Sequence, residues 1–398
     1  MKHLITAILL LLLLACNNKT EKKEQVQLEV EKPAKVEMLA DNQLRYLELS
    51  GTPYERGLTH GTLLKKEIHE VIQFLKDDIK ESTGQDPDAY ISSFLESTHF
   101  EASIAQYTPE LIEELKGISD GSEIDYNTLL MHQLPDEYWI DKLALQMHKC
   151  SSFGVDKSVN NPSMTAQNMD IPTYYHGYQT VIKIKEDSGK QMMFLTIPGF
   201  LGLTGMNNKD VSVNVNTLLH LANNNSGLPV TFMVRGLVSK ETQEEAINFL
   251  LETAHASGQN YIIGGPEKVY DFECSANEKV AFRPFNNAMF TYHTNFPLAN
   301  KDYNQTMVNG VEQFGITWEE SMTCERYPSF EKRFTKETTN ITVEDIKEVL
   351  SSRDNDGRDV VSNESTYASI IYVLSNNPEF IIAPGKPHEV GFIVLNFE

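Results

Sequence analysis

The chain has 398 residues, of which 40% are hydrophobic, so it is long and apolar enough to bury a sizeable core. Its 34 basic and 56 acidic residues give a formal net charge of −22 at pH 7. Binding of nucleic acid depends on neutralising phosphates with lysine and arginine, so this charge argues against nucleic acid and against anionic lipid headgroups as partners.

The first residues, 1–15, have the pattern of a lipoprotein signal peptide. The apolar run from Leu4 to Ala15 is shorter than the roughly 20 residues that span a bilayer, but it suits a signal-peptide core. It ends in Leu-Leu-Ala-Cys16, which resembles a bacterial lipobox. We therefore expect a lipidated Cys16, a flexible tether over residues 16–43, and a lipid-anchored protein of the cell envelope, in the outer membrane and facing the periplasm or the surface.

The region 44–149 is mainly helical by its apolar spacing. A strand is expected at Leu44–Leu49, and the apolar residues from Leu63 to Leu75 then recur at helical intervals. Further helical patterns lie around 88–97, 108–118 and 127–149. The sequence therefore predicts a helical segment that ends at residue 149.

From Cys150 onward the apolar period changes from helical to two, as in Ile182 and Ile184, which alternate with lysines. Short strands follow, interrupted by helical segments expected near 229–239, 242–257, 318–335 and 342–352. Helices and antiparallel strands come in blocks, without the alternation of a parallel α/β sheet. This order predicts an α+β fold in which two packed antiparallel sheets lie between outer layers of helices.

Cys150 stands where the helical pattern gives way to strands. If the bond after Lys149 were cut, Cys150 would carry both a thiol and a free α-amine, whose reference pKa of about 7.7–8.0 lets it accept the thiol proton. The competing interpretation is a small buried hydrophobic residue at a strand start. Apart from Cys16, the cysteines are odd in number, so no disulfide framework is implied. No group of residues has metal-ligand spacing, and we expect no cofactor.

Several motifs stand in a defined order around Cys150. They are Glu55-Arg56-Gly57, Gln167-Asn168-Met169-Asp170, Val-Asn-Val-Asn216, Arg235-Gly-Leu, Phe272-Glu273 and His293-Thr294-Asn295. In this order, over roughly residues 51–390, the chain resembles the acyl-coenzyme A:6-aminopenicillanic-acid acyltransferase family of autoproteolytic peptidases. It is more distantly similar to choloylglycine hydrolases and acid ceramidase. The resemblance implies the four-layer αββα sandwich of N-terminal-nucleophile hydrolases.

The resemblance also implies roles for single residues. Cys150 would be the nucleophile, released by self-cleavage after Lys149, and Asp170 would hold the new α-amine. Asn295 would be the oxyanion donor, and Asn216 a second polar group beside it by similarity to choloylglycine hydrolases. A side-chain amide in that position contributes about 3–4 kcal/mol of transition-state stabilisation.

Two further residues are candidates for contacts with the substrate. Arg235 lies in a predicted helix, where it would form either a buried structural ion pair or a contact with a substrate carboxylate. Phe296 follows the oxyanion residue and is expected to line the pocket.

The function implied by the resemblance is that of an N-terminal-nucleophile cysteine amidohydrolase or acyltransferase. It would act on C–N amide bonds of small acylated substrates through a thioester, as a heterodimer of an α chain (44–149 with its tether) and a β chain (150–398), and contact a membrane through its lipid anchor only. Two alternatives remain open. One is an unprocessed hydrolase with His293 as the base for Cys150, and the other is an inactive, ligand-binding surface lipoprotein with this fold.

Overall fold

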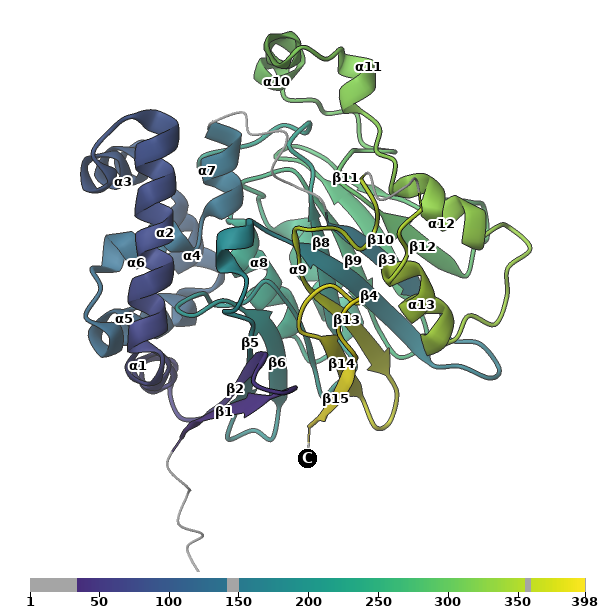
Figure 1. Cartoon of the computed structure of the whole chain (residues 1–398), viewed down its shortest axis with the longest axis horizontal. Helices are drawn as coiled ribbons and strands as arrows, with labels where there is room; N and C mark the ends of the chain where they lie inside the picture. Colours follow the sequence, from purple (N-terminus) through teal and green to yellow (C-terminus); the bar gives the residue numbers. More distant parts are fainter. Residues whose placement is uncertain (1–33, 142–149, 355–358, 398) are drawn as a thin grey trace, which may run out of the picture. The chain divides into compact units, whose positions relative to one another are not determined.

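The computed structural model describes residues 34–141, 150–354 and 359–397 (Figure 1). The predicted signal peptide, the lipidation site Cys16 and the residue before the expected cleavage, Lys149, lie outside these ranges. Within the described ranges, no helix is both long and apolar enough to cross a membrane.

Two β-sheets form the centre of the described chain. The first sheet runs in the spatial order β1 (Val36–Leu39), β2 (Leu44–Leu49), β5 (Thr180–Lys185), β6 (Gln191–Thr196), β7 (Thr204–Asn207), β8 (Ser212–Thr217), β9 (Gln259–Gly264), β10 (Val269–Cys274) and β11 (Lys279–Ala281). The second sheet runs in the order β12 (Phe290–His293), β3 (Ser151–Val155), β4 (Ser163–Asp170), β13 (Thr366–Leu374), β14 (Glu379–Ala383) and β15 (Ile393–Asn396).

The helices belong to two groups. Those before Cys150 are α1 (Pro53–Leu63), α2 (Lys65–Thr83), α3 (Pro87–Glu96), α4 (Phe100–Tyr107), α5 (Pro109–Ser122), α6 (Tyr126–His132) and α7 (Pro135–Asp141). Those after it are α8 (Val230–Val238), α9 (Gln243–Glu252), α10 (Gln305–Gly310), α11 (Trp318–Ser321), α12 (Tyr327–Arg333) and α13 (Val343–Leu350), with 3₁₀ turns at Thr173–Tyr175 and Val311–Phe314.

Hydrophobic clusters hold these elements in four layers. One cluster joins the outer face of the first sheet, through residues such as Ile184 and Val213, to α2, α5 and α8. A second cluster lies between the sheets, where Met193 and Leu195 meet Ile370. A third joins Phe153 and other residues of the second sheet to α12 and α13. Figure 1 shows these two helices on the side of the sheets opposite to α1–α7. The predicted αββα sandwich is confirmed.

The prediction of two wholly antiparallel sheets is wrong at one position, because β2 pairs in parallel with β5. Between these strands the chain passes through α1–α7 and through β3 and β4 of the second sheet. A crossover of this length brings the chain back to the same end of the sheet, which parallel pairing requires. The sheet also starts earlier than expected, because β1 lies within the predicted tether.

Two predicted helices are divided in the structure. The pattern predicted over 127–149 forms α6 and then α7 in its described part, and residues 142–149 lie outside the described ranges. Helix α7 begins at Pro135, a residue that can start a helix but not continue one. The pattern over 318–335 likewise forms α11 and α12, and α12 has a proline in its first turn. Helix α13 begins with a capping box, in which Thr342 and Asp345 are reciprocal partners.

The Gly57 motif serves helix packing. Helices α1 and α5 approach so closely that a Cβ atom at Gly57 would lie 2.0 Å from the backbone oxygen of Glu114. Gly117 on α5 has the matching role, since a Cβ there would lie 2.1 Å from the oxygen of Tyr54. The glycines are required because no side chain fits between the two backbones.

Candidate active site

Cys150 lies directly before β3, which is flanked by β12 and β4 in the second sheet. Its Sγ is 3.8 Å from Sδ of Met169 and 3.7 Å from the backbone oxygen of Asp170. The residue is only 7% exposed. Burial, reinforced by the negative charge of Asp170, raises the pKa of the Cys150 thiol to about 12. A neighbouring base is therefore needed to form the reactive thiolate.

Arg326, at the start of α12, connects Cys150 to Asn295. Its Nη1 donates to the backbone oxygen of Cys150 at 2.5 Å and to Oγ of Ser151 at 3.1 Å. Its Nη2 donates to Oδ1 of Asn295 at 3.2 Å, and its Nε donates to Asp359 at 3.0 Å. The guanidinium is buried, so its planar fork fixes the predicted nucleophile and the predicted oxyanion residue relative to each other.

Asp170 is the last residue of β4, next to the thiol of Cys150. Its Oδ2 accepts a hydrogen bond from Nδ2 of Asn363 at 2.5 Å. Asn363 is itself held by its own loop, because its Oδ1 accepts from the backbone nitrogen of Ser365 at 2.8 Å. The carboxylate of Asp170 is thus buried and oriented, and its charge acts on the Cys150 thiol.

The two predicted amide residues differ in their contacts. Nδ2 of Asn295 donates to the backbone oxygen of Thr217 at 3.1 Å, which leaves the second hydrogen of this amide for a further acceptor. Asn216 is fully buried on β8, and its side-chain atoms have no hydrogen-bond partner within the described ranges. The contact of Asn295 is with Thr217, which follows Asn216 in the sequence and is the last residue of β8.

His293 lies at the end of β12, and the contacts of its ring are with groups other than Cys150. Its Nε2 donates to Oε1 of Glu273 at 2.8 Å, and its Nδ1 donates to the backbone oxygen of Thr294 at 2.8 Å. Burial disfavours the charged ring, but the hydrogen bond and the charge of Glu273 outweigh it and raise the pKa of His293. Both ring nitrogens face acceptors other than Cys150, and this geometry disfavours the Cys–His alternative.

Glu273 also anchors the loop after Asn295. Its carboxylate accepts hydrogen bonds from the backbone nitrogens of Leu298 at 2.6 Å, Ala299 at 2.9 Å and Asn300 at 2.7 Å. Glu273, paired with His293, therefore holds the loop that follows the predicted oxyanion residue.

A small cavity of about 60 Å³ opens at Cys150. Its walls come from both sheets and from the helices α7 and α8, and they are mostly apolar. Among the lining residues are Trp139, Met169, Ile197, Leu203, Val215 and Val234. Polar groups are few and include Asp136, Asp170 and Thr217. This composition is typical of a binding site in which a few polar groups orient a mainly apolar ligand.

Neither predicted substrate residue is among those that line this cavity. Arg235 is 4% exposed and binds Glu114 through both terminal nitrogens, at 2.8 and 2.9 Å. Of the two roles considered for Arg235, the structure therefore favours the ion pair, and the prediction of a substrate contact is withdrawn. The ring of Phe296 packs against Tyr327 with centroids 5.7 Å apart, so it supports α12 instead of the cavity wall.

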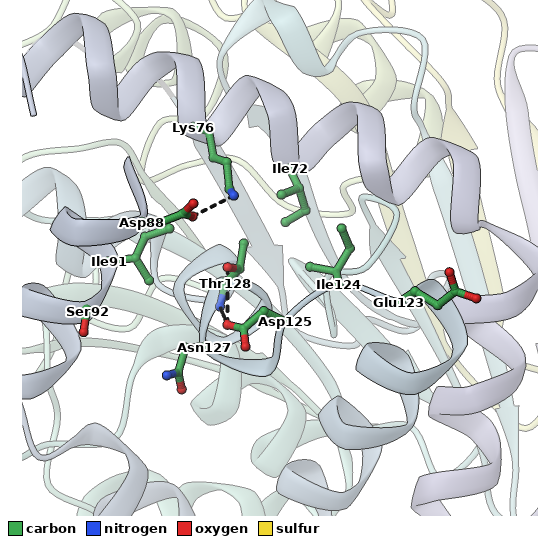
Figure 2. A pocket seen from close by; sticks show the side chains of 10 residues that line it. All are labelled: Ile72, Lys76, Asp88, Ile91, Ser92, Glu123, Ile124, Asp125, Asn127 and Thr128. Carbon is green, nitrogen blue, oxygen red and sulfur yellow. Dashed lines mark hydrogen bonds and ion pairs between the residues drawn. The ribbon is translucent and has the colours of Figure 1, made fainter. Parts of the chain in front are cut away.

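A larger pocket of about 440 Å³ lies among the helices α2, α3 and α6 (Figure 2). An ion pair between Lys76 and Asp88, 2.7 Å long, stands at its rim, and Asp125 caps the backbone of Thr128. None of its lining residues belongs to the predicted catalytic set, so the smaller cavity at Cys150 is the candidate active site.

Comparison with known sequences settles the family. Residues 158–377 match the family described as acyl-coenzyme A:6-aminopenicillanic acid acyl-transferase. The chain belongs to this family. The matched residues include Asp170, Asn216, Asn295 and Arg326, whereas Cys150 stands just before them. The resemblance expected from the ordered motifs is confirmed.

Two relatives illustrate the membership. Protein dcd1A of Dictyostelium discoideum is 28% identical over 245 residues, which are 53% of this chain and 53% of that protein. The 40 kDa form of acyl-coenzyme A:6-aminopenicillanic-acid-acyltransferase of Emericella nidulans is 25% identical over 231 residues, 58% of this chain and 63% of that protein. The matched part of the chain thus covers less than two thirds of the length of either relative.

A solved structure is also similar. The N-acylethanolamine-hydrolyzing acid amidase orthologue of Caenorhabditis elegans aligns with a TM-score of 0.41 and 19% identity, over 56% of this chain and 92% of that chain.

Sequence reasoning missed Arg326, Asn363 and Asp136. Arg326 and Cys150 are 176 residues apart in the chain, and Asn363 and Asp170 are 193 apart. An arginine before an aromatic residue in a helical stretch carries no distinguishing local signal. The one available hint was positional, because Asp136 and Glu137 are adjacent acids directly before the apolar residues Tyr138, Trp139 and Ile140.

Proposed function

We propose that the chain is an N-terminal-nucleophile cysteine amidohydrolase or acyltransferase that acts on C–N amide bonds of small acylated substrates. The observation that carries this proposal is the connection of Cys150 to Asn295 by Arg326, with the backbone oxygen of Asp170 3.7 Å from the cysteine sulfur. Membership in a family named for acyl transfer supports the same class of reaction.

The proposed first half-reaction uses the α-amine that cleavage after Lys149 would release. This amine takes the thiol proton of Cys150, and the thiolate attacks the carbonyl carbon of the substrate amide. Asp170 orients the resulting ammonium, and Nδ2 of Asn295 donates to the oxyanion of the tetrahedral intermediate. The C–N bond then breaks, the ammonium returns its proton to the leaving amine, and a thioester on Cys150 remains.

The second half-reaction decides between hydrolysis and transfer. Water or an acceptor amine gives a proton to the α-amine and attacks the thioester carbonyl. The C–S bond breaks, the thiolate is reprotonated, and a carboxylic acid or a new amide leaves. The shielded setting of Cys150, whose thiol pKa burial raises, suits this mechanism because the base lies on the same residue and needs no exposed partner.

Intact-mass analysis after incubation with a panel of acyl amides tests the proposal. The wild-type protein should gain the mass of an acyl group on the fragment that begins at Cys150, and Cys150→Ala should gain none. Cys274→Ala is the matched control, because Cys274 is another buried cysteine but lies in the core of the first sheet. An adduct that persists in Cys150→Ala, or that disappears in Cys274→Ala, would count against Cys150 as the nucleophile.

Processing and location are part of the same proposal. We propose that the mature protein is a non-covalent pair of residues 16–149 and 150–398, and that lipid on Cys16 anchors it in the cell envelope. The support for both is the sequence: the lipobox-like end of the apolar run and the motif order around Cys150.

A further inference from the structure

Asp136 is a carboxylate in the wall of the Cys150 cavity that the proposed mechanism does not use. It stands in the first turn of α7 and is 7% exposed. Its Oδ2 accepts hydrogen bonds from Oγ1 of Thr217 at 2.7 Å and from Nε2 of Gln259 at 2.6 Å. Its Oδ1 accepts none from the part of the chain that the structure describes. The carboxylate is therefore held firmly in place with one oxygen to spare.

No cationic side chain of the described residues forms a salt bridge with Asp136 or with its neighbour Glu137. Glu137 accepts from Oγ of Ser257 at 2.8 Å and from the backbone nitrogen of Val230 at 3.2 Å, and its Oε2 has no partner among the described residues. Burial raises the pKa of Asp136, and burial together with the charge of Asp136 raises the pKa of Glu137 to about 7. Buried charged carboxylates are normally paired with a cation, and the described residues supply none to Asp136 or Glu137.

Arg326, the cation that connects Cys150 to Asn295, is already bound to other groups. Its nitrogens bind Cys150, Ser151, Asn295 and Asp359. The α-amine of a processed Cys150 would be held by Asp170. Neither group pairs with Asp136, so a positively charged ligand in the cavity would supply a partner that the described residues do not.

The rest of the cavity limits the size of that ligand. The cavity is small, about 60 Å³, so it suits a short group better than a long one. The walls formed by Ile197, Leu203, Val215 and Val234 are apolar. A short aliphatic group that carries one positive charge matches both the walls and the carboxylate.

We propose that Asp136 binds a primary ammonium on a short acyl group, so that the substrates are aminoacyl amides. This inference rests on the proposed function, because it assumes that the acyl group attacked by Cys150 occupies this cavity. Asp136 acts as a specificity-determining residue: it selects an acyl group with an ammonium over one without, and it takes no part in the proton transfers at Cys150.

A binding experiment tests the subsite independently of turnover. Isobutylamine and isobutanol have the same size and differ in charge, and calorimetry would measure their affinities for the full-length protein. The amine should bind at least about 10-fold more tightly than the alcohol, as expected for a buried charge pair. Asp136→Asn should remove this preference, since the amide keeps the bonds to Thr217 and Gln259 but not the charge. Glu137→Gln is the matched control and should retain it.

A turnover experiment then separates the subsite from the proposed function. The wild type should hydrolyse alanyl p-nitroanilide at least about 10-fold more efficiently than propionyl p-nitroanilide, and Asp136→Asn should lower kcat/KM for the first substrate only. Equal binding of amine and alcohol, a preference for the alcohol, no binding of the amine, or a preference that survives in Asp136→Asn overturns the subsite. Hydrolysis of both anilides with no effect of Asp136→Asn overturns the subsite and leaves the proposed function intact. If no anilide or other acyl amide forms an acyl-enzyme, the proposed function fails, and amine binding alone decides the subsite.

Discussion

The substitution Arg326→Lys addresses the connection between the predicted nucleophile and the predicted oxyanion residue. Lysine keeps the charge but loses the planar fork, so it cannot bind Cys150 and Asn295 together. Each hydrogen bond to a charged group contributes about 1.5–3 kcal/mol, so the loss of two costs about 3–6 kcal/mol. At about 1.4 kcal/mol per factor of ten, kcat should fall by roughly 10²–10⁴. KM should change much less, because Arg326 is not among the residues that line the cavity.

The assay is steady-state kinetics on the amide that gives the acyl-enzyme, with thermal unfolding as a check of the fold. Arg333→Lys is the matched control: Arg333 lies on the same helix, but binds Asp354 at 2.6 Å and the backbone of Ser329. It should have near wild-type kcat. If Arg326→Lys keeps kcat within about threefold of the wild type, or if Arg333→Lys loses as much, the proposed role of Arg326 is refuted.

Four further predictions follow from the site and the sequence. Asn295→Ala should lower kcat by about 10²–10³ and leave KM nearly unchanged in steady-state kinetics; a large rise in KM alone would contradict an oxyanion role. Cys150→Ala should appear as one uncleaved chain by intact mass, where the wild type gives two fragments; a single wild-type chain with full activity would exclude the N-terminal nucleophile. Cys16→Ser should move from the membrane fraction to the soluble fraction, and a variant still bound to membranes would rule out the lipid anchor. The pKa of His293 is raised on folding, so its pairing stabilises the protein fully below the unfolded value of about 6.5 and loses that effect as pH rises through the folded pKa. The difference in melting temperature between wild type and His293→Gln should therefore shrink from pH 6 to alkaline pH, and a constant difference would show that charge is not involved.

The layers of the fold could be predicted because they depend on patterns of apolar residues that are local in the sequence. Apolar residues at helical spacing from Leu63 to Leu75, and alternation around Ile182, report which face of each element is buried. The capping residue Thr342 and the proline of α7 likewise act within one helical turn. Pairing across the sheet is different, because the parallel contact of β2 with β5 depends on the path of the intervening chain.

The candidate site was accessible from sequence only in part, and mainly through the order of motifs. That order pointed to Cys150, Asp170 and Asn295, which the structure brings to one place. The residues that connect them are distant in sequence, and their roles depend on burial and orientation. The role of Arg235 could not be predicted either. Only the position of Glu114 in the structure distinguishes an ion pair from a substrate contact.

The arrangement of the core explains how a cleaved chain would stay assembled. Residues on both sides of Cys150 share one hydrophobic cluster, in which Ile68 and Leu115 of the helical segment pack with Ile184 and Phe194 of the first sheet. The pairing of β2 with β5 adds backbone hydrogen bonds across the same division. Burial of apolar surface stabilises by about 25 cal/mol per Å². The surface buried between the two segments would therefore hold them together without the peptide bond after Lys149. The cavity wall needs both segments as well, since Asp136 precedes the division and Thr217, which binds it, follows. Cleavage after Lys149 would therefore free the amine of Cys150 without releasing the segment that shapes the site.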